Sequence, residues 1–151
     1  MKSQILPTDT DYQKFLQEIK DQIRNARIHA SHAVNHELIN LYWNIGKEIV
    51  ERQEKFGWGK SIVERLATDL QKDFPNTSGF SSRNLWDMRR FYIEYKDYPN
   101  LRQLVAEIPW GQHLLILSKI KDLEMRKYYL SATVQCGWSR NILLNQIKAQ
   151  A

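Results

Sequence analysis

This chain of 151 residues has a single cysteine, Cys136, and few of the residues that break regular structure, with four prolines and six glycines. One cysteine excludes a disulfide within the chain, and it cannot form the cysteine cluster of a structural zinc site. We therefore expect a chain that folds without cross-links in a reducing, cytoplasmic setting. In such a chain Cys136 is expected to be a buried structural thiol.

Long apolar runs and catalytic motifs are also missing. No apolar run is long enough to cross a bilayer, and the segment Met1–Pro7 lacks the apolar core of a secretory signal. There is no glycine-rich phosphate loop, no G-x-S-x-G and no H-E-x-x-H. His29, His32 and His36 share one helix face, but no cysteine lies nearby, so we expect neither a metal site nor a cofactor. The sequence predicts a binding module rather than an enzyme.

Aromatic and basic residues are what the chain does contain. Five Trp, seven Tyr and five Phe can build one core, and the scarcity of proline and glycine favours helices. No segment alternates as a strand does, so we predict an all-α helical bundle with a long N-terminal helix. The net charge is +5, and the basic excess lies in residues 119–151. A basic patch of this kind can bind a phosphate backbone.

The long helix is expected from about Asp9 to Lys55, where Gly46 is the only glycine and proline is missing. It either breaks near residues 30–35 and folds back, or continues and packs its first half against a partner; we favour the second. Apolar and small residues recur there at spacings of four and three, a heptad seam: Tyr12, Leu16, Ile19, Ile23, Ala26, Ala30 and Ala33. We expect residues 1–33 to form a helical arm that joins copies into a homo-oligomer, and residues 34–151 to form the core domain.

Residues 60–97 are predicted to form a helix-turn-helix or winged-helix-like unit. A first helical pattern begins at Ser61, residues 74–79 end it, and a second helix follows the capping residue Ser81. On the second helix we expect the DNA contacts to be Ser82, Arg83, Asn84 and Arg90. Arginine reads guanine or phosphate, asparagine reads adenine, and a helix N-terminus holds phosphate. Further phosphate contacts are expected in the basic last third: Lys119, Lys121, Arg126, Lys127 and Arg140.

The same pattern also fits two helices that pack in a bundle without touching DNA. Arg83 and Asp87 are four residues apart, as are Arg90 and Glu94, so this face partly neutralises itself. The break between the helices is also longer than the usual turn of about 3–4 residues. An oligomerisation or protein-interaction module without direct DNA contact is therefore the alternative function. Helical spacing places Leu85, Met88, Phe91, Tyr92 and Tyr95 on one side of the second helix, which we expect to face the core. Arg89 lies beside this stripe, where we expect it to stack on an aromatic ring or pair with a carboxylate.

The rest of the chain is expected to consist of short helices. Residues 108–111 are predicted to form a turn, and residues 112–120 a helix. Asp122 is expected to cap a helix that ends near Gln135, and Ser139 a last helix over residues 140–148.

Short matches spread over residues 15–148 carry a resemblance to a known family. They are Arg27, Val34-Asn35, Leu41-Tyr42-Trp43, Ile45-Gly46, Gly59, Leu66, Asp69-Leu70, Phe80-Ser81, Asn84-Leu85, Met88-Arg89, Phe91-Tyr92, Pro109-Trp110-Gly111, Arg126, Tyr129 and Gly137-Trp138-Ser139. In this order and spacing they resemble the N-terminal helical domain of the YhcG-type bacterial proteins, whose C-terminal half is a PD-(D/E)XK nuclease-like domain. The family often has histidine directly after Pro-Trp-Gly, whereas this chain has Gln112 followed by His113.

The resemblance implies an all-helical domain of a cytoplasmic bacterial protein that binds DNA or self-associates in service of the nuclease domain. It also implies that the nuclease half, with its metal-binding acids, is not part of this chain. The expected function is thus an accessory DNA-binding domain, with DNA, a second copy and a nuclease-like domain as its partners.

Overall fold

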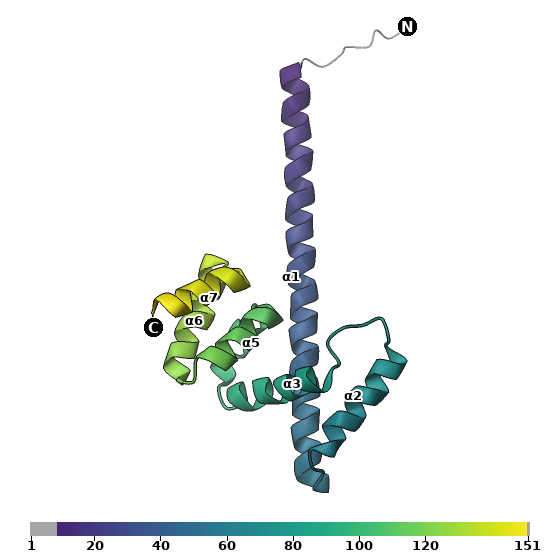
Figure 1. Cartoon of the computed structure of the whole chain (residues 1–151). Helices are drawn as coiled ribbons and strands as arrows, with labels where there is room; N and C mark the ends of the chain where they lie inside the picture. The colour runs from purple at the N-terminus through teal and green to yellow at the C-terminus, as the bar shows by residue number, and fades with distance from the viewer. Residues whose placement is uncertain (1–8, 151) are drawn as a thin grey trace. The chain divides into compact units, whose positions relative to one another are not determined.

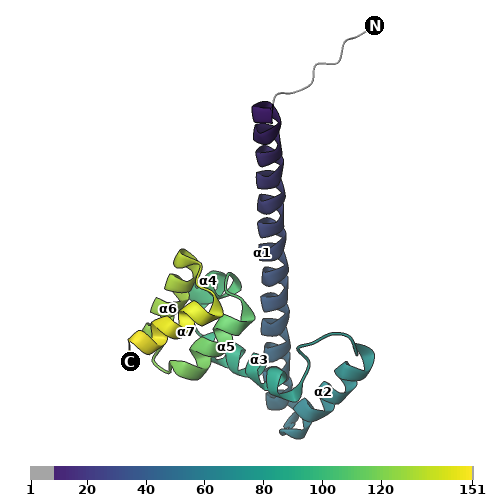
Figure 2. The same cartoon turned by 45° about the horizontal axis from the view of Figure 1, so that its top comes forward.

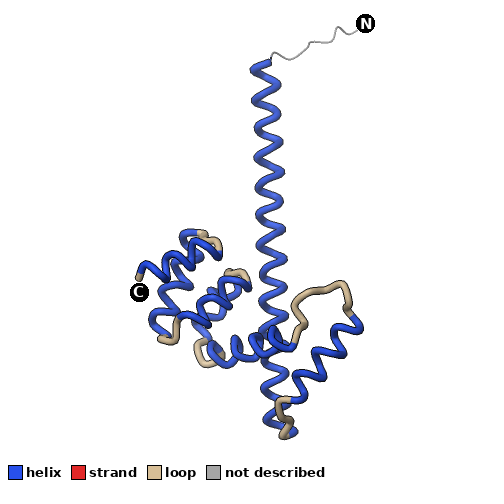
Figure 3. Tube along the Cα trace, in the orientation of Figure 1, coloured by secondary structure: helices blue, strands red, loops and turns tan. Residues whose placement is uncertain are grey.

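The computed structural model describes residues 9–150, and every regular element in that range is a helix (Figures 1 and 3). The elements are α1 Asp9–Phe56, α2 Ser61–Asp73, α3 Ser82–Tyr95, the 3-10 turn η1 Pro99–Leu101, α4 Arg102–Ala106, α5 Trp110–Lys119, α6 Leu123–Cys136 and α7 Arg140–Ala149. The prediction of an all-α bundle with a long first helix is confirmed. Because a wing is a β-hairpin and residues 9–150 contain no strand, the winged variant has no wing in this range.

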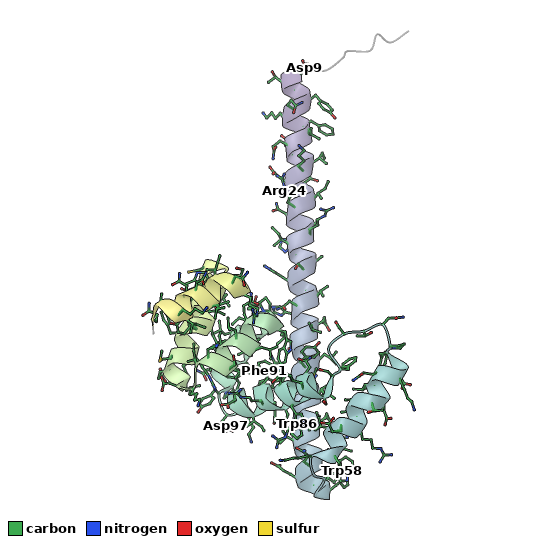
Figure 4. All side chains as sticks on the ribbon, in the orientation of Figure 1. Asp9, Arg24, Trp58, Trp86, Phe91 and Asp97 are labelled. Carbon is green, nitrogen blue, oxygen red and sulfur yellow. The ribbon has the colours of Figure 1, made fainter. Side chains whose placement is uncertain are left out.

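The chain divides into two compact units, residues 1–34 and residues 35–151. The described part of the first unit is the beginning of α1, on which Figure 4 marks Asp9 and Arg24. None of residues 9–34 is buried. The seam side chains Tyr12, Ile19 and Ile23 are exposed, and Leu16 is half-buried. The first unit thus carries an apolar stripe that its own residues do not cover.

Three helices of the second unit begin where the sequence predicts. The Ser81 hydroxyl accepts a hydrogen bond from the Asn84 amide at 3.1 Å and starts α3. The Asp122 carboxylate accepts the Met125 amide and starts α6, and the Ser139 hydroxyl accepts the Ile142 amide and starts α7. Each cap satisfies a backbone donor that the helix leaves free, which contributes about 1 kcal/mol.

Two local predictions are wrong. Trp110 and Gly111 do not lie in a turn but begin α5, because Pro109 adopts an extended conformation and presets the start of the helix one residue later. Cys136 is exposed rather than buried. It is the last residue of α6, where Gly137 turns the chain in the left-handed region at φ 63°.

The core of the second unit consists of two apolar clusters that share α3. The main cluster joins Ile39 of α1 and Phe91 of α3 with α4, α5, α6 and α7, whose arrangement Figure 2 shows. The second cluster packs Tyr42 and Ile49 of α1 against Val63 of α2 and Leu85 of α3. On the predicted core face of α3, Leu85, Met88, Phe91 and Tyr95 are buried, and Tyr92 is half-buried.

Gly46 sets how closely α1 and α3 approach each other. It is buried, and a Cβ atom at this position would overlap the backbone carbonyl of Met88. Only glycine permits this contact between two helix backbones.

Candidate nucleic-acid interface

A cleft of about 580 Å³ lies along the polar face of α3. Its walls come from Tyr42 of α1, from the loop before α3, from α3 itself, from α5 and from the start of α7. The lining residues used below are Ser78, Ser81, Arg83, Asn84, Asp87, Arg90, Trp110, Ser118 and Arg140. Four residues predicted to contact DNA therefore share one cavity, although Arg140 is far from α3 in the sequence. We call this cavity the α3 cleft.

The starts of three helices line the α3 cleft. Ser81 is the capping residue of α3, Trp110 is the first residue of α5, and Arg140 is the first residue of α7. The first amides of a helix have no partner within the helix, and the helix dipole places partial positive charge at this end. Three such ends around one cavity favour an anion, and phosphate is one of the anions that helix N-termini bind.

The three arginines of the α3 cleft differ in what they already bind. Arg90 donates a hydrogen bond from Nη2 to the Leu117 carbonyl oxygen at 2.6 Å, and its Nε lies 3.8 Å from a Glu94 oxygen. Arg83 and Arg140 are exposed, and within residues 9–150 neither guanidinium makes a hydrogen bond or ion pair shorter than the usual limits. Arg83 and Arg140 thus keep their guanidinium groups available to a ligand, although the charge of Arg83 also acts on Asp87.

Asn84 holds the cleft wall together instead of pointing a free amide into it. Its Nδ2 donates to the Gly79 carbonyl at 2.7 Å, and its Oδ1 accepts the Trp110 indole N–H at 2.8 Å. The indole ring is further fixed by edge contacts with Tyr42 and Phe91. Each aromatic pair of this kind adds about 0.5–1.5 kcal/mol beyond its burial. The amide thus links the loop before α3 to α5.

Asp87 is the one acidic residue of the cleft. Burial raises the pKa of its carboxyl, while the positive charges of Arg83 and Arg90 act in the opposite direction. With three arginines and one aspartate in the lining, the cleft carries a net positive charge. This balance favours a ligand with more than one negative charge.

The remaining residues predicted to contact DNA lie outside the α3 cleft. Ser82 is half-buried at the start of α3. Lys119, the last residue of α5, and Lys121 beyond it are exposed, and Lys127 is partly exposed and bonds Glu124. Arg126 is 3% exposed. Its guanidinium donates to the Ile120 carbonyl at 2.6 Å and to Glu94 at 2.8 Å. All its strong contacts lie within the chain, so it joins α6 to α3 and to the end of α5.

The prediction that Arg89 stacks on an aromatic ring within the fold is confirmed. Its guanidinium lies over the Trp86 ring at 5.6 Å, and its Nε donates to Gln53 at 2.6 Å. His36 bonds Glu107 at 2.9 Å. Within the part of the chain that the structure describes, no group of three or more His, Cys, Asp or Glu is placed to hold a metal ion.

The sequence matches the DUF1016 N-terminal domain over residues 18–151. The chain belongs to this family. It is also similar to the protein named "Putative nuclease YhcG" of Escherichia coli (strain K12), at 26% identity over 176 aligned positions. The alignment covers 95% of this chain and 46% of that protein, so the chain spans about half the length of the relative. No solved structure matches the chain.

The family match covers the seam from Ile19 onward and the whole α3 cleft, since the cleft residues lie between positions 42 and 140. The resemblance seen in the sequence is therefore confirmed at the level of the family. None of the helices within residues 9–150 has the length and apolar character that crossing a membrane requires.

Proposed function

We propose that this DUF1016 N-terminal domain is an accessory DNA-binding domain that holds the phosphate backbone in the α3 cleft. The observation that carries the proposal is the meeting of three helix starts with the exposed guanidinium groups of Arg83 and Arg140. Arginine forms bidentate hydrogen bonds with phosphate, and the helix ends add amide donors.

The geometry favours phosphate binding over base reading. The Asn84 amide is engaged on both sides, and Arg90 is tied to the end of α5. The α3 face is also bordered by α5 and α7, since both contribute to the cleft walls. A helix-turn-helix built on α2 and α3 would then dock on DNA chiefly through its backbone contacts, which set position but carry little sequence information. The exposed Lys119 and Lys121 would extend this contact along the backbone.

The test is the salt dependence of binding to a short duplex, followed by fluorescence anisotropy. Replacing both arginines (Arg83→Gln with Arg140→Gln) removes two phosphate contacts. We expect weaker binding and a slope of log K against log salt that is less steep by about 2, because each phosphate contact contributes about 0.9.

The matched control is Lys47→Gln with Lys55→Gln, which removes the same charge from exposed positions of α1 outside the α3 cleft. We expect the control to keep the slope of the unaltered chain. Equal slopes for the two double variants would show that binding depends on net charge and not on the α3 cleft. Failure of the unaltered chain to bind duplex or single-stranded DNA at low salt would remove the proposal.

Self-association is a second candidate function, and a separate observation favours it. The stripe that runs from Tyr12 to Ile23 is exposed although it is apolar, and no residue of the first unit covers it. Joining two copies would bring two α3 clefts to one duplex, as dimeric DNA-binding proteins do. In longer relatives it would also bring together two copies of a nuclease-like domain. Sedimentation of the chain over a range of concentrations tests this function.

A further inference from the structure

A second cavity, of about 770 Å³, lies between the C-terminal half of α1 and α2. Its floor and walls are almost entirely apolar, formed by Leu41, Ile45, Ile49, Trp58, Ile62, Leu66, Leu70, Phe74 and Phe80. Three of these side chains keep large exposed fractions: 46% for Leu41, 42% for Trp58 and 49% for Phe74. A contiguous exposed apolar surface in a folded domain marks a binding site. We call this cavity the α1–α2 groove.

We propose that the α1–α2 groove of one copy receives the first part of the seam of a second copy, residues 12–23 of α1. This inference rests on the proposed self-association and names the surface that the seam meets. A groove between two helices is completed by a third helix that presents apolar residues at i, i+3 or i+4, and i+7. Tyr12, Leu16, Ile19 and Ile23 have this spacing.

The groove and the first part of the seam have the same length. The groove extends over residues 41–52 of α1 and over most of α2. Twelve residues of helix are about 18 Å long at 1.5 Å per residue. The seam from Tyr12 to Ile23 covers the same number of residues. One seam therefore fills one groove along three turns.

The charges also suit a helix of this chain. The charged residues that line the groove are two basic and two acidic side chains: Arg52, Arg65, Glu48 and Asp69. The seam segment is balanced in the same way, with Lys14, Lys20, Glu18 and Asp21. DNA and anionic membranes both select surfaces with a basic excess, which this rim does not have.

The occupant is assigned to a second copy because of the sequence between seam and groove. Residues 24–40 contain no glycine and no proline, the residues that most readily end a helix. The sequence therefore offers no turn by which a seam would reach the groove of its own chain. When two copies exchange seams, each gives one seam and accepts one, so the contact closes with two-fold symmetry.

The experiment uses the full chain and two double variants, measured by sedimentation velocity. The seam variant is Ile19→Asp with Ile23→Asp, and the groove variant is Leu41→Asp with Phe74→Asp. All four positions are exposed or at the border of exposure, so folding is expected to persist, which circular dichroism verifies. We expect the unaltered chain to dimerise and each variant to raise the dissociation constant about 100-fold or more, as loss of central apolar anchors does.

Mixing the two variants gives the decisive measurement. The groove variant keeps an intact seam and the seam variant keeps an intact groove, so an equimolar mixture has one complete contact. We expect the mixture to form heterodimers although each variant alone is monomeric. Ile28→Asp, on the same helix but off the seam, and Val134→Asp, an exposed position of α6, are the controls and should both dimerise normally.

Each other outcome has a defined meaning. If the groove variant dimerises like the unaltered chain while the seam variant does not, seams pair with seams, so self-association stands and the groove assignment fails. If the mixture stays monomeric, the exchange between copies is wrong. If the unaltered chain is a monomer at every concentration, both the groove assignment and the proposed self-association fail, and the DNA proposal is unaffected.

Discussion

His113 shows how one side chain can make the stability of this domain depend on pH. It is fully buried in α5, and its Nε2–H donates to the Val105 carbonyl oxygen at 2.7 Å. Its Nδ1 is buried and has no hydrogen-bond partner within residues 9–150. Burial lowers the pKa of His113 to about 4. The ring is thus held neutral among Phe91, Tyr95 and Trp110.

This lowered pKa predicts a loss of stability in acid. The unfolded chain binds a proton at His113 below about pH 6.5, whereas the folded chain does so only near pH 4. The contribution of neutral His113 to the free energy of unfolding is therefore complete above about pH 6.5. It decreases as the pH falls from 6.5 toward 4, by roughly 3 kcal/mol in total. Urea unfolding at several pH values measures this slope. His113→Leu should flatten the slope in this window, whereas His29→Gln, at an exposed position, should not. Identical slopes for the two variants would contradict the assignment.

At the scale of elements, the crossing of α1 and α3 depends on the missing side chain of Gly46. We expect Gly46→Ala to lower the free energy of unfolding by about 2 kcal/mol or more, because the added methyl group meets the rigid Met88 backbone. Gly59→Ala is the matched control, since nothing lies within 4 Å of its Cβ position. It should change stability by less than about 0.5 kcal/mol. Equal effects of the two substitutions in chemical denaturation would mean that the crossing can widen freely.

The helix caps could be predicted from the sequence, whereas the partner of Arg126 could not. Ser81, Asp122 and Ser139 predict helix starts because capping is a local interaction within three residues. The role of Arg126 depends on Glu94, which lies 32 residues away, and no local pattern identifies that partner. Helical spacing could still have predicted that Arg126 is buried, because it shares one face of α6 with the buried Tyr129, Leu130 and Thr133.

For a similar reason, only some of the residues that line the α3 cleft could be predicted from the sequence. The basic and polar residues of α3 follow from helical periodicity, and Arg140 from its charge alone. That Arg140 lies in the same cavity as Arg83 depends on how α7 packs against α5. The engagement of Asn84 by the Trp110 indole joins residues 26 positions apart. Long-range packing therefore decides which polar side chains remain free to bind.

For the molecule as a whole, the two units should differ strongly in local stability. No side chain of residues 9–34 is buried, and an isolated helix without packing is only marginally stable in water. Hydrogen exchange at low protein concentration should therefore show fast exchange for amides of residues 9–34 and slow exchange in α3 and α5. Protection of residues 12–23 should rise with protein concentration as copies associate. Slow exchange of these amides in dilute solution would contradict this picture.

The exposed cysteine at the end of α6 has a practical consequence. Because it is the single thiol of the chain, a nitroxide reagent would attach one spin label to each copy without any substitution. Dipolar spectroscopy would then yield a distance between two identical labels in an assembly. A narrow distribution would indicate one defined geometry, which would constrain how the second units of two associated copies face each other.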